Sequence, residues 1–165
     1  LVKSALPHQC TLVPDNNTQL TSDHGFDLTK DGKKLIPVIE ELKCLGVRVS
    51  LFMDPDLQQL DLAKKIGADR IEFYTGPYAA NFTLEKENDN FNQLFNRFYD
   101  AARHANDIGL GINAGHDLNL ENLPKFGTIP GLQEVSIGHA LTVDSLRMGM
   151  AATVQQYLKI CQQAL

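Results

Sequence analysis

Two glycine–histidine pairs stand where predicted strands end. Gly115-His116 follows the run 112–114, and Gly138-His139 follows the run 135–137. Both imidazoles should therefore lie at the carboxyl end of a strand, where parallel α/β enzymes place their chemistry. Glycine lets the backbone approach a ligand closely, and the N–H groups that open the next helix bind anions without lysine or arginine. The two pairs predict a phosphate site with histidines available for proton transfer.

An alternation of polar and apolar residues in the strands directs one carboxylate inward. If Ile71 and Phe73 face the helices, Glu72 must face the other way. The same alternation places further polar side chains on that face: Ser50, Asn113 and Ser136. Strands covered on both faces usually read as continuous apolar runs, so the pattern predicts a polar lumen. An enclosed carboxylate costs several kcal/mol unless it is paired, so a salt bridge of Glu72 with Arg48 or Arg70 is the structural alternative to a functional role.

Metal binding is a competing interpretation of His116 and His139, with Asp117 as a third ligand. The sequence has neither an H-x-x-x-H pattern nor two neighbouring cysteines, the spacings typical of zinc sites, so we predict no metal. The segment 15–27 is rich in Asp, Asn and Thr and should lie at the same edge of the sheet. It is long enough to form a mobile lid, and an ordinary surface loop is the alternative.

The elements that must position these residues alternate along the chain. Strands are expected at 9–13, 47–53, 70–74, 111–114 and 134–137. Helices are expected at 90–108 and 144–162, where apolar residues recur every three or four positions, and Gly46 and Gly67 should end two earlier helices. Pro37 lies inside another apolar pattern, so that helix should start near Lys34 or be kinked.

This alternation predicts an α/β protein with a parallel sheet. No repeat, linker or charge block divides residues 1–165, so we expect a single domain. Five βα units can complete an open doubly wound sheet. They cannot close a parallel barrel, which takes eight units and typically about 250 residues. Because Leu1 is not an initiator methionine, we expect the native protein to be longer.

The composition excludes several classes of protein. The 165 residues are 43% hydrophobic and 21% charged, which is typical of a globular protein rather than a disordered one. A net charge of −5 argues against nucleic acid as a partner. The three scattered cysteines predict reduced thiols in a cytoplasmic protein. No apolar run is long enough to cross a membrane, so no membrane partner is expected.

Five motifs in this order resemble the pyridoxine 5′-phosphate synthases of deoxyxylulose-dependent vitamin B6 synthesis. They are Leu12-Val13-Pro14, Val49-Ser50-Leu51-Phe52, Ile71-Glu72-Phe73-Tyr74-Thr75-Gly76, Asn113-Ala114-Gly115-His116 and Ile137-Gly138-His139-Ala140. The resemblance spans nearly the whole chain and implies a TIM (β/α)8 barrel that assembles as a homo-octamer. This chain would cover the last five βα units. The family's base histidine, a second glutamate and most phosphate-binding arginines would then lie in the first three units.

The resemblance also implies an activity and roles for individual residues. The family condenses 1-deoxy-D-xylulose 5-phosphate with 3-amino-2-oxopropyl phosphate to pyridoxine 5′-phosphate, inorganic phosphate and water, a transferase-type reaction that needs no organic cofactor. By resemblance, Glu72 stabilises the transition state, His116 donates a proton and Thr21 contacts the pentulose phosphate. The backbone seat for the aminoketone phosphate falls on Asp117, Gly138 and His139.

The chain departs from the family pattern at two places. Asp117 stands where the family usually has glycine, and a carboxylate beside a phosphate costs about 1 kcal/mol unless it points away. Asn16-Asn17 replaces a basic pair in the lid. Two alternatives to the B6 enzyme stay open: another sugar-phosphate barrel enzyme, such as an aldolase or isomerase, and an inactive scaffold subunit. No lysine suited to Schiff-base chemistry ends a predicted strand, which counts against the aldolase.

Overall fold

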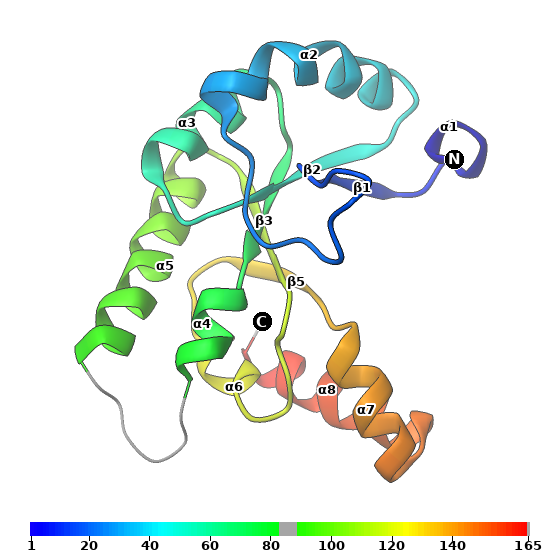
Figure 1. Cartoon of the computed structure of the whole chain (residues 1–165), viewed down its shortest axis with the longest axis vertical. Coiled ribbons are helices and arrows are strands. Elements are labelled where there is room, and N and C mark those ends of the chain that lie inside the picture. The colour runs from blue at the N-terminus through cyan, green and yellow to red at the C-terminus, as the bar shows by residue number, and fades with distance from the viewer. Residues whose placement is uncertain (83–88, 165) are drawn as a thin grey trace.

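The computed structural model describes residues 1–82 and 89–164 and contains a five-stranded sheet (Figure 1). The strands are β1 (Gln9–Leu12), β2 (Arg48–Met53), β3 (Arg70–Tyr74), β4 (Gly111–Gly115) and β5 (Leu132–Ser136). They pair in chain order and every neighbouring pair is parallel. The predicted α/β class and all five strands are confirmed. Only β5 begins earlier than expected, and its pairing with β4 has a register irregularity beside Asn113.

Helices connect the strands and cover one face of the sheet. They are α1 (Val2–Ala5), α2 (Leu28–Cys44), α3 (Leu57–Lys65), α4 (Gly76–Asn81), α5 (Asp89–Asp107), α6 (Leu123–Phe126), α7 (His139–Met148) and α8 (Met150–Ala164). Figure 1 shows α2, α3 and α5 along one side of the sheet, whereas α7 and α8 pack as a pair at the other end of the molecule. No helix within the described ranges is both long and apolar enough to cross a bilayer.

Capping residues set the boundaries of the covering helices. The Asp27 side chain accepts a hydrogen bond from Thr29 N at the start of α2, and Asp56 accepts from two backbone N–H groups at the start of α3. Gly46 and Gly67 follow these helices with φ of 75° and 95°, a conformation that glycine adopts without a Cβ penalty. The predicted glycine stops are therefore confirmed, and each leads directly into the next strand.

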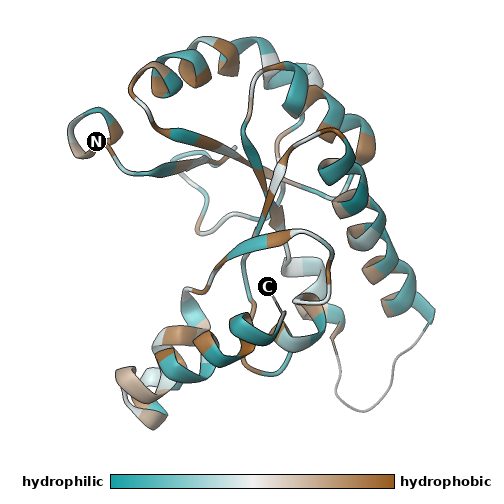
Figure 2. Cartoon of the chain, turned by 180° about the vertical axis from the view of Figure 1, so that it is seen from behind, coloured by the Kyte–Doolittle hydropathy of each residue, from teal (hydrophilic) through white to brown (hydrophobic). Residues whose placement is uncertain are grey.

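The helix-facing side of the strands is apolar. Leu51, Met53, Ile71 and Phe73 are fully buried, and the Phe73 ring packs edge-on against Phe98 of α5 with centroids 5.6 Å apart. Figure 2 shows polar and apolar residues alternating along the strands, while the helices carry both kinds. Burial of this face is the main stabilising contribution, because free energy scales with the apolar area removed from water.

Two helices differ from the expected boundaries. For the helix containing Pro37, a start near Lys34 was wrong, because α2 begins at Leu28 where Asp27 caps it, and the exposed Pro37 lies inside it; the alternative of a kink at Pro37 stays a prediction. The carbonyl that loses its partner belongs to Lys33, which is also exposed, so water can hydrate it. The single helix expected at 144–162 is instead α7 and α8, divided at Gly149, whose φ of 83° and ψ of 144° end the first helix.

The opposite face of the sheet is polar and curved. Gln9 of β1 donates to Glu134 of β5 at 3.0 Å, although three strands separate them in the sheet. Arg48 of β2 and Arg70 of β3 also reach Glu134, at 2.7 and 3.0 Å. These contacts require the sheet to curl so that its two edge strands approach each other across a concave face.

The break at Gly149 makes a stability prediction. Gly149→Ala should lower the free energy of unfolding by about 1–3 kcal/mol, because this backbone conformation is almost restricted to glycine. Nothing lies within 4 Å of an added Cβ, so the cost is purely conformational. In Gly32→Ala the new Cβ meets its nearest neighbours at 3.8 Å inside α2, so this control should gain up to about 1 kcal/mol. Denaturant unfolding measures both, and equal effects of the same sign would contradict this explanation.

Candidate active site

A cavity of about 740 Å³ opens at the carboxyl ends of the strands on the concave side. It is lined by Thr11, Val13, Thr21, Ser22, Phe52, Glu72, His116, Asp117, Ser136, Gly138 and His139. All six residues singled out from the sequence are in this set: Thr21, Glu72, His116, Asp117, Gly138 and His139. The structure therefore brings together residues from four separate parts of the chain: the loop after β1, the strand β3, the turn after β4 and the start of α7. The volume lies within the range usual for small-molecule sites.

The predicted polar face is enclosed as expected. Ser50 and Asn113 are 0% and 1% exposed, and Glu72 is 9% exposed. Ser136 is exposed as a residue, but it lines the cavity rather than the outer surface. The alternation of side chains thus predicted correctly which face of the sheet carries the polar groups.

The Glu72 carboxylate is held by a hydroxyl rather than by a cation. Thr11 Oγ1 donates to Glu72 Oε2 at 2.8 Å. Burial raises the pKa of Glu72 above its usual value, and hydrogen bonds from Thr11 and Ser136 oppose that rise. Arg48 and Arg70 pair with Glu134 instead. The structural alternative that placed either arginine on Glu72 is therefore wrong.

Gly115 leaves room for this carboxylate. A Cβ at Gly115 would collide with Glu72 Oε1 and would meet Ser136 Cβ at 3.1 Å. Glycine is therefore required at position 115 because any larger residue would clash with Glu72 of the neighbouring strand. This close approach keeps Glu72 within the cavity beside the end of β4.

His116 is contacted from two directions. Its Nε2 lies 2.9 Å from Thr21 Oγ1 of the loop after β1, and its Nδ1 lies 3.2 Å from Asp117 Oδ2. The Asp117 carboxylate accepts from Nδ1–H, and the Thr21 hydroxyl, which is both donor and acceptor, bonds to Nε2 with or without a proton on that nitrogen. The Tyr74 ring packs edge-on against the imidazole with centroids 5.3 Å apart. Contacts at both ring nitrogens and with the Tyr74 ring therefore fix the orientation of the imidazole.

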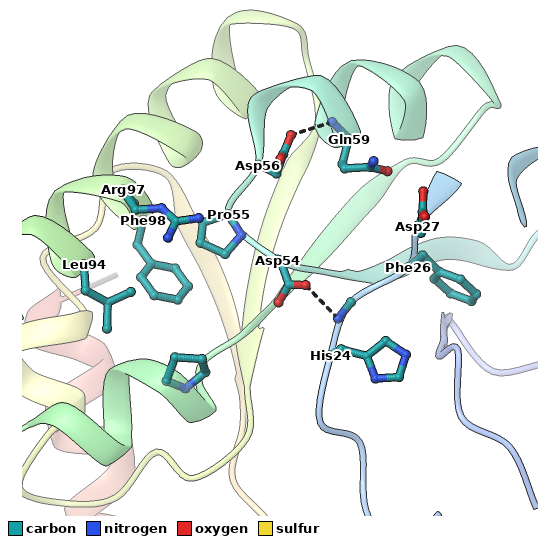
Figure 3. Close-up of a pocket in the computed structure, with 12 residues that line it drawn as sticks. His24, Phe26, Asp27, Asp54, Pro55, Asp56, Gln59, Leu94, Arg97 and Phe98 are labelled. Carbon is teal, nitrogen blue, oxygen red and sulfur yellow. Dashed lines mark hydrogen bonds between the residues drawn. The ribbon is translucent and has the colours of Figure 1, made fainter. Parts of the chain in front are cut away.

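The loop that carries Thr21 is tied down at its far end. Phe26 N donates to Phe52 O at 2.9 Å, and Gly25 N donates to Asp54 Oδ2 at 3.2 Å. Figure 3 shows the Asp54 carboxylate directed at this backbone beside His24. A Cβ on Gly25 would overlap the backbone at the end of β2, so only glycine allows this approach. The loop reaches the cavity from a fixed anchor.

Figure 3 also shows a second cavity, of about 520 Å³, between this anchor and α5. Its polar lining includes Asp54, Asp56, Gln59 and Arg97. It contains none of the six predicted site residues. The cavity at the strand ends is larger and holds the histidines and the buried glutamate.

The second Gly-His pair lies at the start of α7. Gly138 is the N-cap residue of this ten-residue helix, and both Gly138 and His139 are exposed to the cavity side. A helix start presents unpaired N–H groups and a partial positive charge to an anion. Across residues 1–82 and 89–164, no group of three or more His, Cys, Asp or Glu side chains is arranged to hold a metal ion.

Some residues of the cavity and of the inner face of the sheet were not singled out from the sequence. Thr11 alternates with Cys10 and Leu12, so the rule that identified Glu72 would also have placed Thr11 inward. Glu134 lies in a strand whose start was misplaced by two residues and whose register shifts beside Asn113, so its interaction with two arginines could not be expected. Phe52 lies two residues after Ser50, so the same alternation places it inward, whereas Ser22 had no local signal of a site.

Parallel strands in chain order, with helices on the outer face and polar groups converging at the strand ends, define an α/β protein with an enzyme-type site. The family described as "Pyridoxal phosphate biosynthesis protein PdxJ" matches residues 1–163, and the chain belongs to this family. The fold is also similar to that of a chain in the crystal structure of the Amycolatopsis orientalis BexX/CysO complex. That match has a TM-score of 0.60 at 14% identity and covers 99% of this chain and 59% of the other.

Curated relatives bear the name pyridoxine 5′-phosphate synthase. The protein from Albidiferax ferrireducens is 49% identical over 165 residues, which is 99% of this chain and 64% of that protein. The protein from Xylella fastidiosa strain 9a5c is 48% identical, covering 97% of this chain and 60% of its own length. The protein from Xanthomonas campestris pv. campestris strain B100 is 49% identical over 97% of this chain and 61% of its own length. The chain thus spans about three fifths of these relatives.

The buried carboxylate makes a prediction about stability and pH. Because burial raises the pKa of Glu72, folding favours its protonated form. The wild-type protein should therefore lose stability as pH rises from the unfolded-state pKa of glutamate to the raised folded-state pKa. Glu72→Gln stays neutral, so its thermal midpoint relative to wild type should be higher at pH 8 than at pH 4. Thermal unfolding at both pH values measures this, and a difference that shrinks with rising pH would show that burial does not control Glu72.

Proposed function

We propose that the protein is a pyridoxine 5′-phosphate synthase, which condenses 1-deoxy-D-xylulose 5-phosphate with 3-amino-2-oxopropyl phosphate. The observation that carries this proposal is the convergence of Glu72, His116 and the Gly138-His139 helix start on one cavity. Family membership and the names of the relatives support the same activity. The products are pyridoxine 5′-phosphate, inorganic phosphate and water, and no organic cofactor takes part.

The chain forms, in this proposal, the last five βα units of a (β/α)8 barrel within a single domain. The curvature of the sheet supports it, because Gln9 of β1 and Glu134 of β5 meet across the concave face. In a closed barrel three further strands would lie between these two edges and enclose the same polar lumen. The remaining phosphate-binding and catalytic groups would come from those strands.

His116 donates a proton during the condensation. Its imidazole is directed by Thr21 on Nε2 and by Asp117 on Nδ1, so the Nε2 side faces the cavity that holds the reacting carbons. A positioned acid or base contributes about 10²–10⁴ in rate. Glu72 acts on the same substrate from β3, where its carboxylate stabilises positive charge that develops on the nitrogen during carbinolamine formation and dehydration. Low exposure strengthens this electrostatic effect.

The phosphate groups bind to backbone and hydroxyl donors. The aminoketone phosphate lies at the N–H groups of Asp117, Gly138 and His139, beside the positive end of α7. Thr21 contacts the pentulose phosphate from the loop after β1. Asp117 costs little here, because its carboxylate turns to His116 Nδ1 rather than to the phosphate. This orientation offsets the electrostatic cost of a carboxylate at position 117, where the family usually has glycine.

The same proposal covers assembly and location. The enzyme assembles as a homo-octamer in the cytoplasm and acts on small phosphorylated substrates, without nucleic acid, membrane or metal. The net charge of −5 and the reduced cysteines support a soluble metabolic role over nucleic-acid binding.

Incubation with both substrates tests the function. The protein expressed from its complete reading frame should yield pyridoxine 5′-phosphate and inorganic phosphate, measured by mass spectrometry and a phosphate assay. Either substrate alone should yield no pyridoxine 5′-phosphate. Cleavage or isomerisation of one sugar phosphate would identify a different barrel enzyme. A folded protein that turns over neither substrate would identify the scaffold subunit.

The role of His116 makes a kinetic prediction. His116→Ala should lower kcat by about 10²–10⁴, with a much smaller change in KM, because a proton donor acts chiefly in the transition state. His104→Ala is the matched control, since His104 pairs with Asp61 on the helix layer and does not line the cavity. Steady-state kinetics with both substrates distinguish the two variants. A His116→Ala enzyme with normal kcat and raised KM would assign the residue to binding alone.

A further inference from the structure

The ends of β3 and β4 are joined by a side chain that does not line the cavity. Thr75 follows the last residue of β3, and its backbone N donates to Gly115 O at 3.2 Å. Its side chain is fully buried. Thr75 Oγ1 also donates to Gly115 O at 2.8 Å and lies within hydrogen-bond reach of His116 O. A single buried hydroxyl thus contacts two successive carbonyl groups of the neighbouring strand end.

Those carbonyls flank the Cα atom of His116. The Gly115 carbonyl belongs to the peptide that precedes His116, and the His116 carbonyl belongs to the peptide that follows it. A group that holds both peptide planes restricts φ and ψ between them. The direction of the His116 side chain follows from φ and ψ, so the hydroxyl of Thr75 acts on the imidazole through the backbone.

The backbone at this point needs such a restraint. His116 and Asp117 have φ of 93° and 57°, in the region that residues other than glycine rarely adopt. Each such residue costs of order 1–3 kcal/mol and persists only where the surroundings determine it. Asn122, which is also buried, holds the far side of the turn by donating from Nδ2 to Asp117 O at 3.1 Å. The strained turn is therefore restrained from both sides.

We propose that Thr75 is a positioning residue for His116: its buried hydroxyl holds the strained turn so that the imidazole meets both Thr21 and the cavity. The expected loss of kcat on removal of this hydroxyl rests on the proposed function, whereas the expected change in the geometry of His116 does not. A purely structural role for Thr75 would lower stability and leave the geometry and turnover of the folded protein unchanged.

Three variants separate these roles. Thr75→Val keeps the shape and removes the hydroxyl, and Thr75→Ser keeps the hydroxyl. Thr153→Val is the control: it removes a fully buried threonine hydroxyl that donates to Gly149 O, just before its own helix, at 3.0 Å. Thr75→Val should lower kcat by about 10–100-fold with less than about a threefold change in KM, since small misplacements of a reacting group cost this much. Thr75→Ser should recover kcat to within about threefold, and Thr153→Val should retain it.

Crystal structures of the full-length variants provide a readout that is independent of activity. In Thr75→Val the His116 backbone should leave its positive φ and the contact between His116 and Thr21 should be lost, while Thr75→Ser should retain both. If Thr75→Val does not fold, Thr75→Ala is read in the same way. Unchanged His116 geometry together with unchanged kcat would overturn the proposal. A displaced His116 in a protein whose wild type makes no pyridoxine 5′-phosphate would instead overturn the proposed function and leave the positioning role of Thr75 intact.

Discussion

The curvature of the parallel sheet is the constraint on which the rest of the structure depends. Because β1 and β5 approach each other, inward side chains from strands that are not neighbours come into contact, as Thr11 and Glu72 do at 2.8 Å. A flat sheet would leave the same residues in water. Curvature therefore turns the ordinary alternation of a strand into an enclosed polar site.

It also accounts for the division of the inner face into two layers. Glu134 forms an ionic cluster with Arg48 and Arg70, the first residues of β2 and β3, and its side chain is 43% exposed; Glu72 lies nearer the carboxyl ends of the strands, without a paired cation among the described residues.

The helix-facing side of the sheet and its polar concave face contribute differently to the protein. Apolar contacts such as Phe73 against Phe98 stabilise the fold and fix the strands. The inner face instead contains a carboxylate whose pKa is raised by burial and a turn with two residues at positive φ. Both features cost stability, and proteins commonly retain such costs at functional sites. The buried carboxylate and the strained backbone, both of which cost stability, thus lie together around His116 and Glu72.

Much of this arrangement could be predicted from the sequence. The alternation of Ile71, Glu72 and Phe73 was sufficient to place the glutamate inward, because side-chain direction in a strand has a period of two residues. The Gly-His pairs predicted the ends of β4 and β5, whereas the helix that begins at His139 was expected to begin only at Asp144. All six predicted site residues line one cavity, although their chemical roles stay predictions.

The remaining features depend on contacts between distant segments. The division of α7 from α8 at Gly149 has no local signal stronger than that of any helical glycine. The partners of Arg48 and Arg70 depend on sheet curvature and on the register of β5, which periodicity does not report. Thr75 looks like an ordinary residue after a strand, and only the approach of β4 reveals what its hydroxyl contacts.

The central claim is that one cavity at the strand ends holds the reacting phosphorylated compounds between Glu72 and His116. A crystal structure of the full-length protein with pyridoxine 5′-phosphate tests it most directly. We expect the phosphate to accept hydrogen bonds from the backbone at Gly138 and His139, with the pyridine ring between the carboxylate and the imidazole. Binding of the product elsewhere, for example in the cavity beside Arg97, with Glu72 and His116 untouched, would contradict the claim.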